Sequence, residues 1–301
     1  MLRIAYFGPQ GTFTEQAARE MAPQDEFVAA DSVSAALTTV RDGVADAACV
    51  PVENSVEGAV AATLDSLAAG DPLVAVAESL LPIRFSVLTR EPDTEIRTVA
   101  SHPHALAQVR EWLATNLPEA RAVAASSTAA AAVAVHDGEY DAAVAAPIAA
   151  RHYPLHVVAT DVADVADART RFLLVRQPGS LPDPTGADRT SIVAVTTNRT
   201  GALAGLLDEL ASRGVNLTRL DARPRQDTFG EYRFFIDVEG HIAEPRVGEA
   251  MMALQRRCDL RFLGSHGRAD GVRPTVGAGA DNDDFAAAAT WLAQVRAGKL
   301  A

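Results

Sequence analysis

One short phrase occurs twice in the chain, each time between a segment of helical spacing and a strand-like segment. The phrase D-G-x-x-D-A-A begins at Asp42 and again at Asp137, 95 residues apart. In a chain so rich in alanine, a match of this length can arise by chance. The order of elements around the two copies also matches, because apolar runs typical of buried strands alternate with helical segments on both sides. This order predicts two similar α/β lobes.

The two lobes are expected to form one domain over residues 1–180. Lobe A would take about residues 1–75 and 165–180, and lobe B about residues 80–160. Strands are expected at Leu2–Gly8, Glu26–Ala30, Ala47–Val52, Thr98–Ala100, Ala120–Ala124 and Ala142–Ala145, and helices at Glu15–Met21, 33–42, Ala105–Leu117 and 127–135.

The segments between and after the lobes complete this layout. Leu73–Ala77 and Pro82–Leu88 read as strands that could form a hinge, and Arg171–Val175 as a strand that returns to lobe A. The layout is that of a bilobal, type II periplasmic-binding-protein-like α/β domain. Ligands would bind at the carboxyl ends of the strands, in a cleft that both lobes share.

A second domain is expected over residues 190–267. Residues 177–186 are rich in Pro and Gly and read as a linker. Beyond them, strands are expected at Ser191–Thr196, Asn216–Ala222, Tyr232–Val238 and Leu260–Leu263, and helices at Gly201–Arg213 and Val247–Arg257, with Gly230 in a hairpin turn. The order βαββαβ predicts a ferredoxin-like sandwich. Residues 268–301 form a tail, in which Phe285–Val295 could form an Ala-rich helix.

Composition excludes several classes of protein. A net charge of −12 argues against a nucleic-acid partner, whose phosphates need a basic face. No apolar run approaches the roughly 20 residues of a membrane helix. Cys49 and Cys258 are far apart, which argues against a disulfide framework and a zinc site and favours the cytoplasm.

Polar residues gather at four places where strands end or turns begin. The clearest is Val50–Gly58, where an apolar run stops at Glu53, Asn54 and Ser55 just before a helical segment. The other clusters are Gly8–Thr14, Ser101–His104 with Gln108, and Thr170–Phe172. Such residues also suit ordinary turns, helix caps and surface ion pairs. Four clusters at the face where α/β lobes bind ligands favour a binding site.

The segments Gly8–Thr14, Val50–Gly58, Ser101–Ala105, Ser127–Ala130 and Thr170–Phe172 resemble, in order and spacing, the motifs of prephenate dehydratases. The unit at about 190–265 resembles an ACT regulatory domain. Its Gly201-Ala202-Leu203 is similar to the G-A-L signature of that domain, and its residues 216–224 are similar to the ligand-loop segment.

The resemblance implies a cytoplasmic carbon–oxygen lyase that converts prephenate to phenylpyruvate, water and CO2 in phenylalanine biosynthesis. It implies no cofactor and no metal. L-phenylalanine would act as a feedback effector at the ACT domain, between subunits of a homodimer or homotetramer whose ACT domains pair. Neither nucleic acid nor membrane is an expected partner.

The resemblance also assigns roles to residues. Thr170 is the implied catalytic hydroxyl, which would donate a hydrogen bond to the leaving oxygen, with Glu53 or water as the source of the proton. Asn54, Ser101 and Gln108 are the other implied catalytic or positioning residues. The implied substrate-binding residues are Gly11, Thr12, Phe13, Ser55, Ser127, Thr128, Arg171 and Phe172. The implied effector-binding residues are Gly201, Ala202, Leu203, Asn216, Leu217, Asp221, Arg223 and Pro224.

The chain departs from the family pattern at two places. Ala168 stands where an asparagine usually precedes the T-R-F motif, and Asp167 or Asp164 could substitute for it. Asp221-Ala222 replaces the usual Glu-Ser, which leaves the strength of feedback open. Two other functions stay open: an arogenate dehydratase, with an amino group on the substrate, and a non-catalytic amino-acid sensor.

Overall fold

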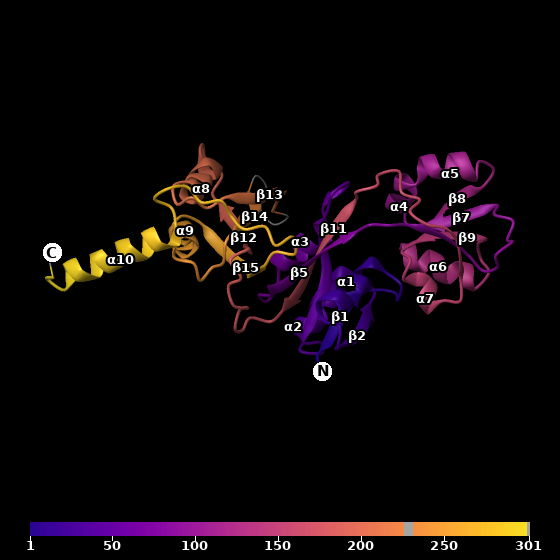
Figure 1. Ribbon diagram of the computed structural model, residues 1–301, viewed down its shortest axis with the longest axis horizontal. Coiled ribbons are helices and arrows are strands. Elements are labelled where there is room, and N and C mark those ends of the chain that lie inside the picture. Colours follow the sequence, from indigo (N-terminus) through magenta and orange to yellow (C-terminus); the bar gives the residue numbers. More distant parts are fainter. Residues whose placement is uncertain (226–230, 300–301) are drawn as a thin grey trace. The chain divides into compact units, whose positions relative to one another are not determined.

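The computed structural model describes residues 1–225 and 231–299, which fall into two compact units (Figure 1). Unit 1 comprises Met1–Ser66 and Ser79–Gln177, and unit 2 comprises Leu67–Glu78 and the chain from Pro178 on. The segment Leu67–Glu78, expected in lobe A and the hinge, therefore groups with the C-terminal unit. Gly230, expected in a hairpin turn, lies outside the described residues.

Lobe A of unit 1 is built on a mixed sheet with the order β11-β3-β1-β2. Its strands are β1 (Arg3–Phe7), β2 (Glu26–Ala30), β3 (Ala47–Asn54) and β11 (Arg169–Arg176), with β4 (Gly58–Ala59) paired to β3. Its helices are α1 (Phe13–Met21), α2 (Val33–Arg41) and α3 (Ala61–Ala68). β1 runs parallel to β2 and β3, and β11 runs antiparallel to β3. The lobe packs around Tyr6, Cys49 and Phe172, which are almost fully buried.

Lobe B repeats this strand order. Its strands are β6 (Ser86–Thr89), β7 (Thr98–Ser101), β8 (Arg121–Ala124), β9 (Ala142–Ala145) and β10 (His156–Ala159). Its helices are α4 (Pro103–Gln108), α5 (Arg110–Asn116), α6 (Thr128–His136) and α7 (Ala149–His152). The order β8-β7-β9-β6 matches β2-β1-β3-β11, with parallel pairs followed by an antiparallel one in each lobe. The two predicted α/β lobes are therefore present, with equivalent topology.

The repeated phrase D-G-x-x-D-A-A performs the same task in both lobes. Its first aspartate ends α2 in lobe A and α6 in lobe B. The glycine that follows has φ +69° in lobe A and +82° in lobe B, a conformation that glycine adopts without strain. The second aspartate accepts backbone N–H groups at the start of the neighbouring strand, from Arg3 at β1 in lobe A and from Arg97 and Thr98 at β7 in lobe B. The two alanines then pair with that strand.

Several predicted elements of unit 1 have different bounds in the structure. The strand expected at Pro82–Leu88, for example, is divided between the end of β5 (Val74–Pro82) and β6. β3 continues through Glu53 to Asn54, because its last residues pair with β11 as well as β4. The single helix expected over Ala105–Leu117 is divided into α4 and α5, since Val109 has φ −124° and ψ +15°. Helix α7 and strand β10 were not predicted.

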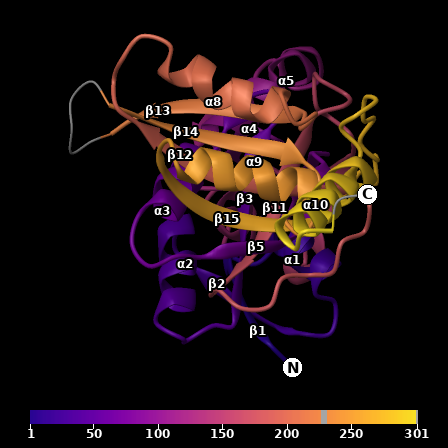
Figure 2. The same ribbon diagram turned by 90° about the vertical axis from the view of Figure 1, so that its left-hand side faces the viewer.

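Unit 2 contains the expected βαββαβ order. Its elements are β12 (Asp188–Thr196), α8 (Ala202–Ala211), β13 (Leu217–Pro224), β14 (Tyr232–Glu239), α9 (Pro245–Gln255) and β15 (Asp259–Gly267). The strand order β13-β14-β12-β15 is that of a ferredoxin-like sandwich, and Figure 2 shows both helices on one face of the sheet. The core between them includes Ile192, Leu206, Ile236 and Leu254. Strand β5 (Val74–Pro82) pairs with β15 in parallel, at Ala75 and Gly264.

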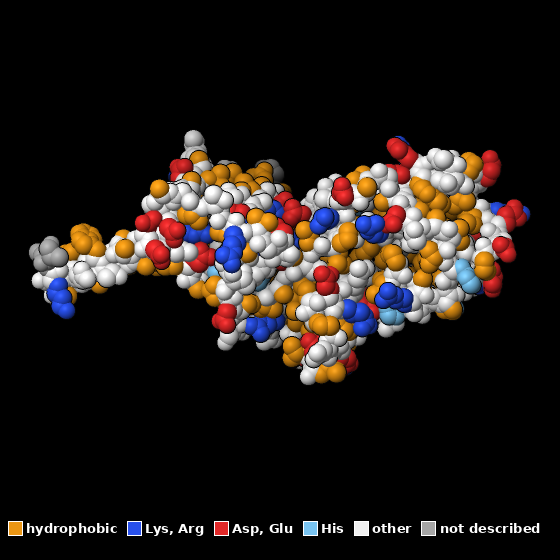
Figure 3. Space-filling model, viewed as in Figure 1, with side chains coloured by type: hydrophobic (Ala, Val, Ile, Leu, Met, Phe, Trp, Pro, Cys, Tyr) orange, Lys and Arg blue, Asp and Glu red, His pale blue; other side chains and the backbone are white. Residues whose placement is uncertain are grey.

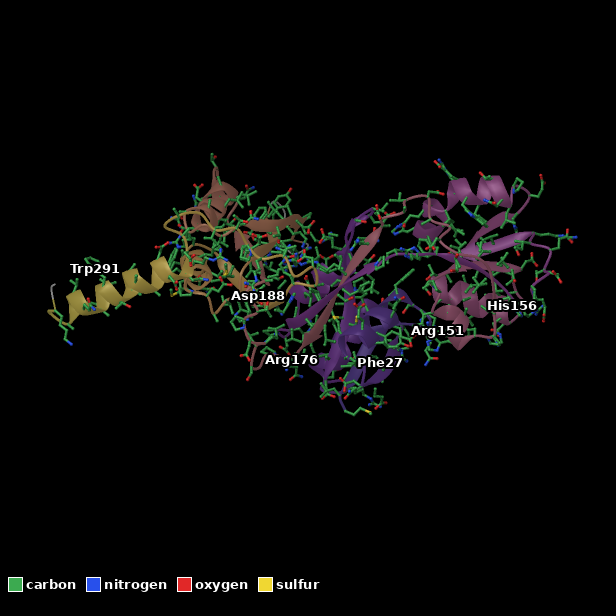
Figure 4. The ribbon with its side chains drawn as sticks, viewed as in Figure 1. Phe27, Arg151, His156, Arg176, Asp188 and Trp291 are labelled. Atoms are coloured by element: carbon green, nitrogen blue, oxygen red, sulfur yellow. The ribbon has the colours of Figure 1, made fainter. Side chains whose placement is uncertain are left out.

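A helix ends the described chain. α10 (Asn282–Arg296) is longer than the predicted Phe285–Val295, because Asp281 and Asp284 form a capping box at its start. None of its described residues is buried, and Trp291 is 64% exposed on it (Figure 4).

The surface has no single charge character on the face drawn in Figure 3, where acidic and basic side chains are interspersed. Among the described residues, no helix is both long and apolar enough to cross a membrane.

Candidate active site

A cavity of about 480 Å³ lies in unit 1, where residues of both lobes converge. Of the residues expected to act on or bind a substrate, those that line it are Thr12, Phe13, Asn54, Gln108, Ser127, Thr128, Thr170 and Phe172. Thr12, Asn54 and Thr170 come from lobe A, and Gln108 and Ser127 from lobe B. The structure thus brings together segments that lie more than a hundred residues apart in the sequence.

Asn54 and Thr170 form a directed hydrogen bond in this cavity. Asn54 Oδ1 accepts the backbone N–H groups of Val56 at 2.8 Å and Glu57 at 3.0 Å. Because a backbone N–H can only donate, the other end of the amide must be Nδ2, which donates to Thr170 Oγ1 at 2.8 Å. The Thr170 hydroxyl therefore accepts from Asn54, and its own hydrogen remains available to a molecule in the cavity.

Two helix N-termini, one from each lobe, open into the same cavity. Thr12 caps α1 by accepting from Glu15 N at 3.2 Å, and Ser127 caps α6 by accepting from Ala130 N at 2.9 Å. Both caps line the cavity, as do the residues that follow them, Phe13 and Thr128. Backbone N–H groups and the helix dipole make such termini favourable places for carboxylates. None of the described residues that line the cavity is Lys or Arg.

Several lining residues were not predicted as site residues. Glu57, His102 and His104 line the cavity together with the apolar Ile83 and Phe85. Burial lowers the pKa of His102, repulsion from His104 lowers it further, and Glu57 partly offsets both. Glu57 and the histidines belong to the polar clusters already noted, so proximity to those motifs was the available signal. Phe85 lies outside those clusters. Its ring centroid is 5.6 Å from that of Phe13, and this contact depends on how the two lobes pack together.

Gln108 stands apart from the other polar residues of the cavity. Its side chain is 8% exposed, and its Oε1 has no hydrogen-bond partner among the described residues. A buried acceptor without a partner costs free energy, of the order of 1–3 kcal/mol. The Gln108 amide is therefore suited to accept a hydrogen bond from a ligand hydroxyl.

Glu53 and Arg171 face away from this cavity. Side chains alternate along a strand, so Glu53 and Arg171 point to the side opposite Asn54 and Thr170. Glu53 is 43% exposed and lies 3.4 Å from the Nε of the buried Arg171. Neither residue is part of the cavity lining. The structure therefore does not bring Glu53 to Thr170.

Three further expected site residues hold backbone in place. Ser55 Oγ accepts from Arg169 N at 2.9 Å, which ties β3 to β11. Ser101 is fully buried, and its Oγ donates to Val144 O. Gly11 N donates to a carboxylate oxygen of Glu15. None of the three is part of the cavity lining.

Ala168 lies in the core of lobe B instead of in the cavity. It is 1% exposed, and its carbonyl accepts from Ile83 N at 2.8 Å. Asp164, one of the suggested substitutes for the usual asparagine, accepts from the N–H groups of Glu111 and Trp112 in the first turn of α5. Neither Asp164 nor Asp167 lines the cavity.

Unit 2 contains a separate cavity of about 390 Å³ at the start of α8. Of the expected effector-binding residues, Gly201, Ala202 and Leu203 line it, together with Tyr232 and Phe234. The remaining expected residues, Asn216, Leu217, Asp221, Arg223 and Pro224, lie at or on strand β13 and outside this lining. Asp221 accepts from Arg219 at 2.8 Å, and Arg219 also pairs with Asp237.

No cluster of His, Cys, Asp or Glu in the part of the chain that the structure describes could hold a metal ion. Cys49 is buried in β3, and burial raises the pKa of its thiol. Cys258 is partly buried and also free.

The family models and the curated relatives agree on one family. The family model for prephenate dehydratase matches residues 4–180, and the model for the ACT domain matches residues 190–255. A prephenate dehydratase of Amycolatopsis methanolica is 70% identical over the whole of both chains.

Two solved structures are also similar. That of prephenate dehydratase from Arthrobacter aurescens in complex with L-Phe is 43% identical, with a TM-score of 0.91 over 98% of this chain and 99% of that one. GqqA, described as a novel type of quorum quenching acylase, is 30% identical, with a TM-score of 0.79 over 88% and 97% of the two chains.

Proposed function

This chain belongs to the prephenate dehydratase family and carries an ACT domain, and we propose that it converts prephenate to phenylpyruvate, water and CO2 under control by L-phenylalanine. The observation that carries the proposal is the Asn54–Thr170 pair, set in a cavity between two helix N-termini. Prephenate is a dianion whose ring loses a hydroxyl group and a carboxylate together, which leaves an aromatic ring.

The reaction requires stabilisation of the leaving oxygen more than it requires a strong acid. The ring carboxylate departs as CO2, its bonding electrons enter the ring, and the C–O bond breaks to release hydroxide. Thr170 donates a hydrogen bond to that oxygen. One proton is consumed when the hydroxide becomes water, and it comes from the buffered solvent, relayed through water. The bond that Thr170 accepts from Asn54 polarises the hydroxyl and strengthens the bond that it donates. Glu53 takes no part, because it faces away from the cavity.

The two carboxylates of prephenate would bind at two different helix N-termini. One would lie at the N-terminus of α1, near Thr12, and the other at the N-terminus of α6, near Ser127 and Thr128. Gln108 would accept from a substrate hydroxyl. Ile83, Phe85 and Phe172 would contact the ring. Binding one carboxylate at each helix N-terminus would fix the dianion between the two lobes. This orientation suits cleavage of both the C–O bond and the bond to the ring carboxylate.

A second candidate substrate is arogenate, in which an ammonium group replaces the keto group of the side chain. Glu57 favours it, since a carboxylate in the cavity lining can pair with an ammonium. A non-catalytic amino-acid sensor is the third reading, and it accounts less well for the directed hydrogen bond on Thr170.

Effector binding, assembly and location follow from the same proposal. L-phenylalanine would bind at the cavity beside Gly201, Ala202 and Leu203. The chain would form a homodimer or homotetramer by pairing of its ACT domains, and β13 is suited to this because it lies at one end of the strand order and carries the exposed Leu220. Its two free thiols suit the cytoplasm.

An assay of the purified chain with prephenate and with arogenate, each with and without L-phenylalanine, tests the proposal. We expect phenylpyruvate from prephenate and a lower rate when L-phenylalanine is added. Faster turnover of arogenate would assign the second substrate. Binding of L-phenylalanine without turnover of either substrate would indicate a sensor. Sedimentation of the same protein gives the oligomeric state.

A further inference from the structure

A buried carboxylate joins the two lobes beside the cavity. Glu15, in the first turn of α1, has no exposed side-chain surface. A buried carboxylate is costly unless hydrogen bonds and positive groups compensate it. The sequence placed Glu15 only at the start of a helix, and the reaction described above does not use it.

The partners of Glu15 come from three places. Its Oε2 accepts from Gly11 N at 2.7 Å, in the loop that precedes α1. Its Oε1 accepts from Arg19 Nε at 2.8 Å, one turn further along the same helix. The same oxygen lies 3.1 Å from His152 Nε2, which belongs to α7 in lobe B. Glu15 therefore links the loop of lobe A to a helix of lobe B.

The loop itself rests on α7. Gly11 has φ +91°, and a Cβ atom built on it would lie 3.0 Å from Ala149 Cα and 3.1 Å from Ala149 Cβ. Tyr153, just after α7, donates from its hydroxyl to Gln10 O at 3.2 Å. Arg151, labelled in Figure 4, marks this helix. Only glycine permits so close an approach with this backbone conformation.

The loop leads directly into the cavity wall. Thr12 and Phe13 follow Gly11, and both line the cavity. Thr12 Oγ1 donates to Phe7 O at 3.1 Å and accepts from Glu15 N, and Phe13 contacts Phe85 of lobe B. A shift of Gly11 would therefore move the α1 N-terminus that faces the ligand.

We infer that Glu15 is a positioning residue, which together with His152 holds the α1 N-terminus and the α7 helix at the spacing that a bound dianion requires. Glu15 does not itself touch the substrate. The inference rests on the proposed function in one respect, namely that Thr12 and Phe13 contact prephenate. Since those contacts hold the substrate and the transition state alike, their disturbance should weaken binding more than it slows the chemical step.

The test compares single variants with a matched control. For Glu15→Ala we expect KM for prephenate to rise about tenfold, the effect of losing one charge-assisted hydrogen bond, with kcat within about twofold. Glu15→Gln keeps an acceptor for Gly11 N and should recover part of the affinity. His152→Gln, in the other lobe, should raise KM in the same direction. Glu20→Gln makes the same charge change on α1 at an exposed residue that bonds Ser79, and should leave KM unchanged.

A double-variant cycle decides between positioning and a merely structural role. If Glu15 and His152 act through each other, the Glu15→Gln, His152→Gln double variant should have nearly the KM of the more affected single variant. Fully multiplicative effects would overturn the inference. So would variants that melt at lower temperature but, when folded, keep the KM of the starting protein. If the starting protein does not turn over prephenate at all, the proposed function fails instead, which is a distinct result.

Discussion

The two lobes share one strand order but differ in where one pair of strands ends. In each lobe the repeated phrase ends a helix, turns at glycine and starts a strand, which is β3 against β1 in lobe A and β9 against β7 in lobe B. In lobe A that strand continues to Asn54, which pairs with Thr170 of the antiparallel neighbour. In lobe B it stops at Ala145, which pairs with Ser86. The shared strand order thus gives two similar lobes, and in the proposed reaction a few residues at one strand end supply the reactive group.

In the proposed binding mode, each lobe contributes different groups to the cavity. Lobe A offers the hydroxyl of Thr170 and the N-terminus of α1, and lobe B offers the N-terminus of α6, Gln108 and the histidines. Repetition accounts for the two helix termini, since each lobe provides one. It does not account for the proposed chemistry, which would depend on the extension of β3 to Asn54, beyond Val50, the residue that corresponds to Ala145 at the end of β9. The predictions below test that difference, from the largest expected effect to the smallest.

Removing the hydroxyl from lobe A should nearly abolish turnover. For Thr170→Ala we expect kcat to fall about 10²–10⁴-fold with little change in KM, because a group that transfers or donates a proton in the transition state is lost. Steady-state assays with prephenate measure both constants. Thr170→Ser should recover much of the rate.

A buried hydroxyl of lobe B provides the control. Ser86 is 1% exposed, pairs with Ala145 at the end of β9, and its Oγ has no partner among the described residues. Ser86→Ala should leave kcat within about threefold, on the view that replacement of an unpaired buried hydroxyl is nearly neutral. Equal losses in the two variants would show that the lobes do not differ in the way described.

Reversing the direction of the hydrogen bond between Asn54 and Thr170 should also lower kcat strongly. Asn54→Asp keeps the acceptor for Val56 N and Glu57 N but replaces the donor to Thr170 with a carboxylate oxygen. The Thr170 hydroxyl would then donate to the aspartate instead of the leaving oxygen. We expect kcat to fall about 10²-fold, the loss typical of one transition-state donor. A variant with the rate of the starting protein would contradict the assignment.

The second aspartate of the repeated phrase should contribute unequally to the stability of the two lobes. Asp141 accepts from Arg97 N, Thr98 N and Thr98 Oγ1, whereas the equivalent Asp46 accepts from Arg3 N. We expect Asp141→Ala to lower the free energy of unfolding by about 1–3 kcal/mol, and Asp46→Ala to lower it by about 1 kcal/mol. Urea unfolding at pH 7 measures both, and an equal or reversed order would count against this account.

The contribution of Asp141 should depend on pH. The Thr98 hydroxyl, assisted by backbone N–H groups of Arg97 and Thr98, lowers the pKa of this carboxyl in the folded chain. Its stabilisation is therefore present above the unfolded value of about 3.9 and is lost as the pH falls through the lower, folded value. The difference in stability between the starting protein and Asp141→Ala should shrink below about pH 4.

The smallest effect is expected at Glu53. Because its side chain is on the opposite side of β3 from Thr170, Glu53→Gln should change kcat by less than about threefold, as is usual for a group that takes no part in proton transfer. Arg171 keeps an uncharged acceptor in this variant. A loss of 10²-fold or more would restore Glu53 as the proton source.

Much of the fold could be predicted from local patterns. The repeated phrase and the alternation of apolar runs gave the two lobes, and the βαββαβ order gave the ferredoxin-like unit, because each pattern depends on nearby residues. The division of the expected helix at Val109 and the grouping of Leu67–Glu78 with unit 2 were not predicted. Both features depend on tertiary packing, which cannot be read from the periodicity of a single sequence.

The site was predicted in part for the same reason. Motifs identified Asn54 and Thr170 as candidates, and both line the cavity. The motif also suggested Glu53, one residue away, but in a strand that step changes the face on which a side chain lies. Glu15 went unnoticed because its importance depends on His152, which lies far along the chain on the other lobe.

The pair Asn54–Thr170 is the centre of this account, and a cycle of kcat values tests it most directly. The cycle compares the starting protein, Asn54→Asp, Thr170→Ala and the double variant in the conversion of prephenate to phenylpyruvate. If Asn54 acts by directing the Thr170 hydroxyl, the double variant will be about as slow as Thr170→Ala alone. If the two losses multiply, Asn54 and Thr170 act independently, and the account is contradicted.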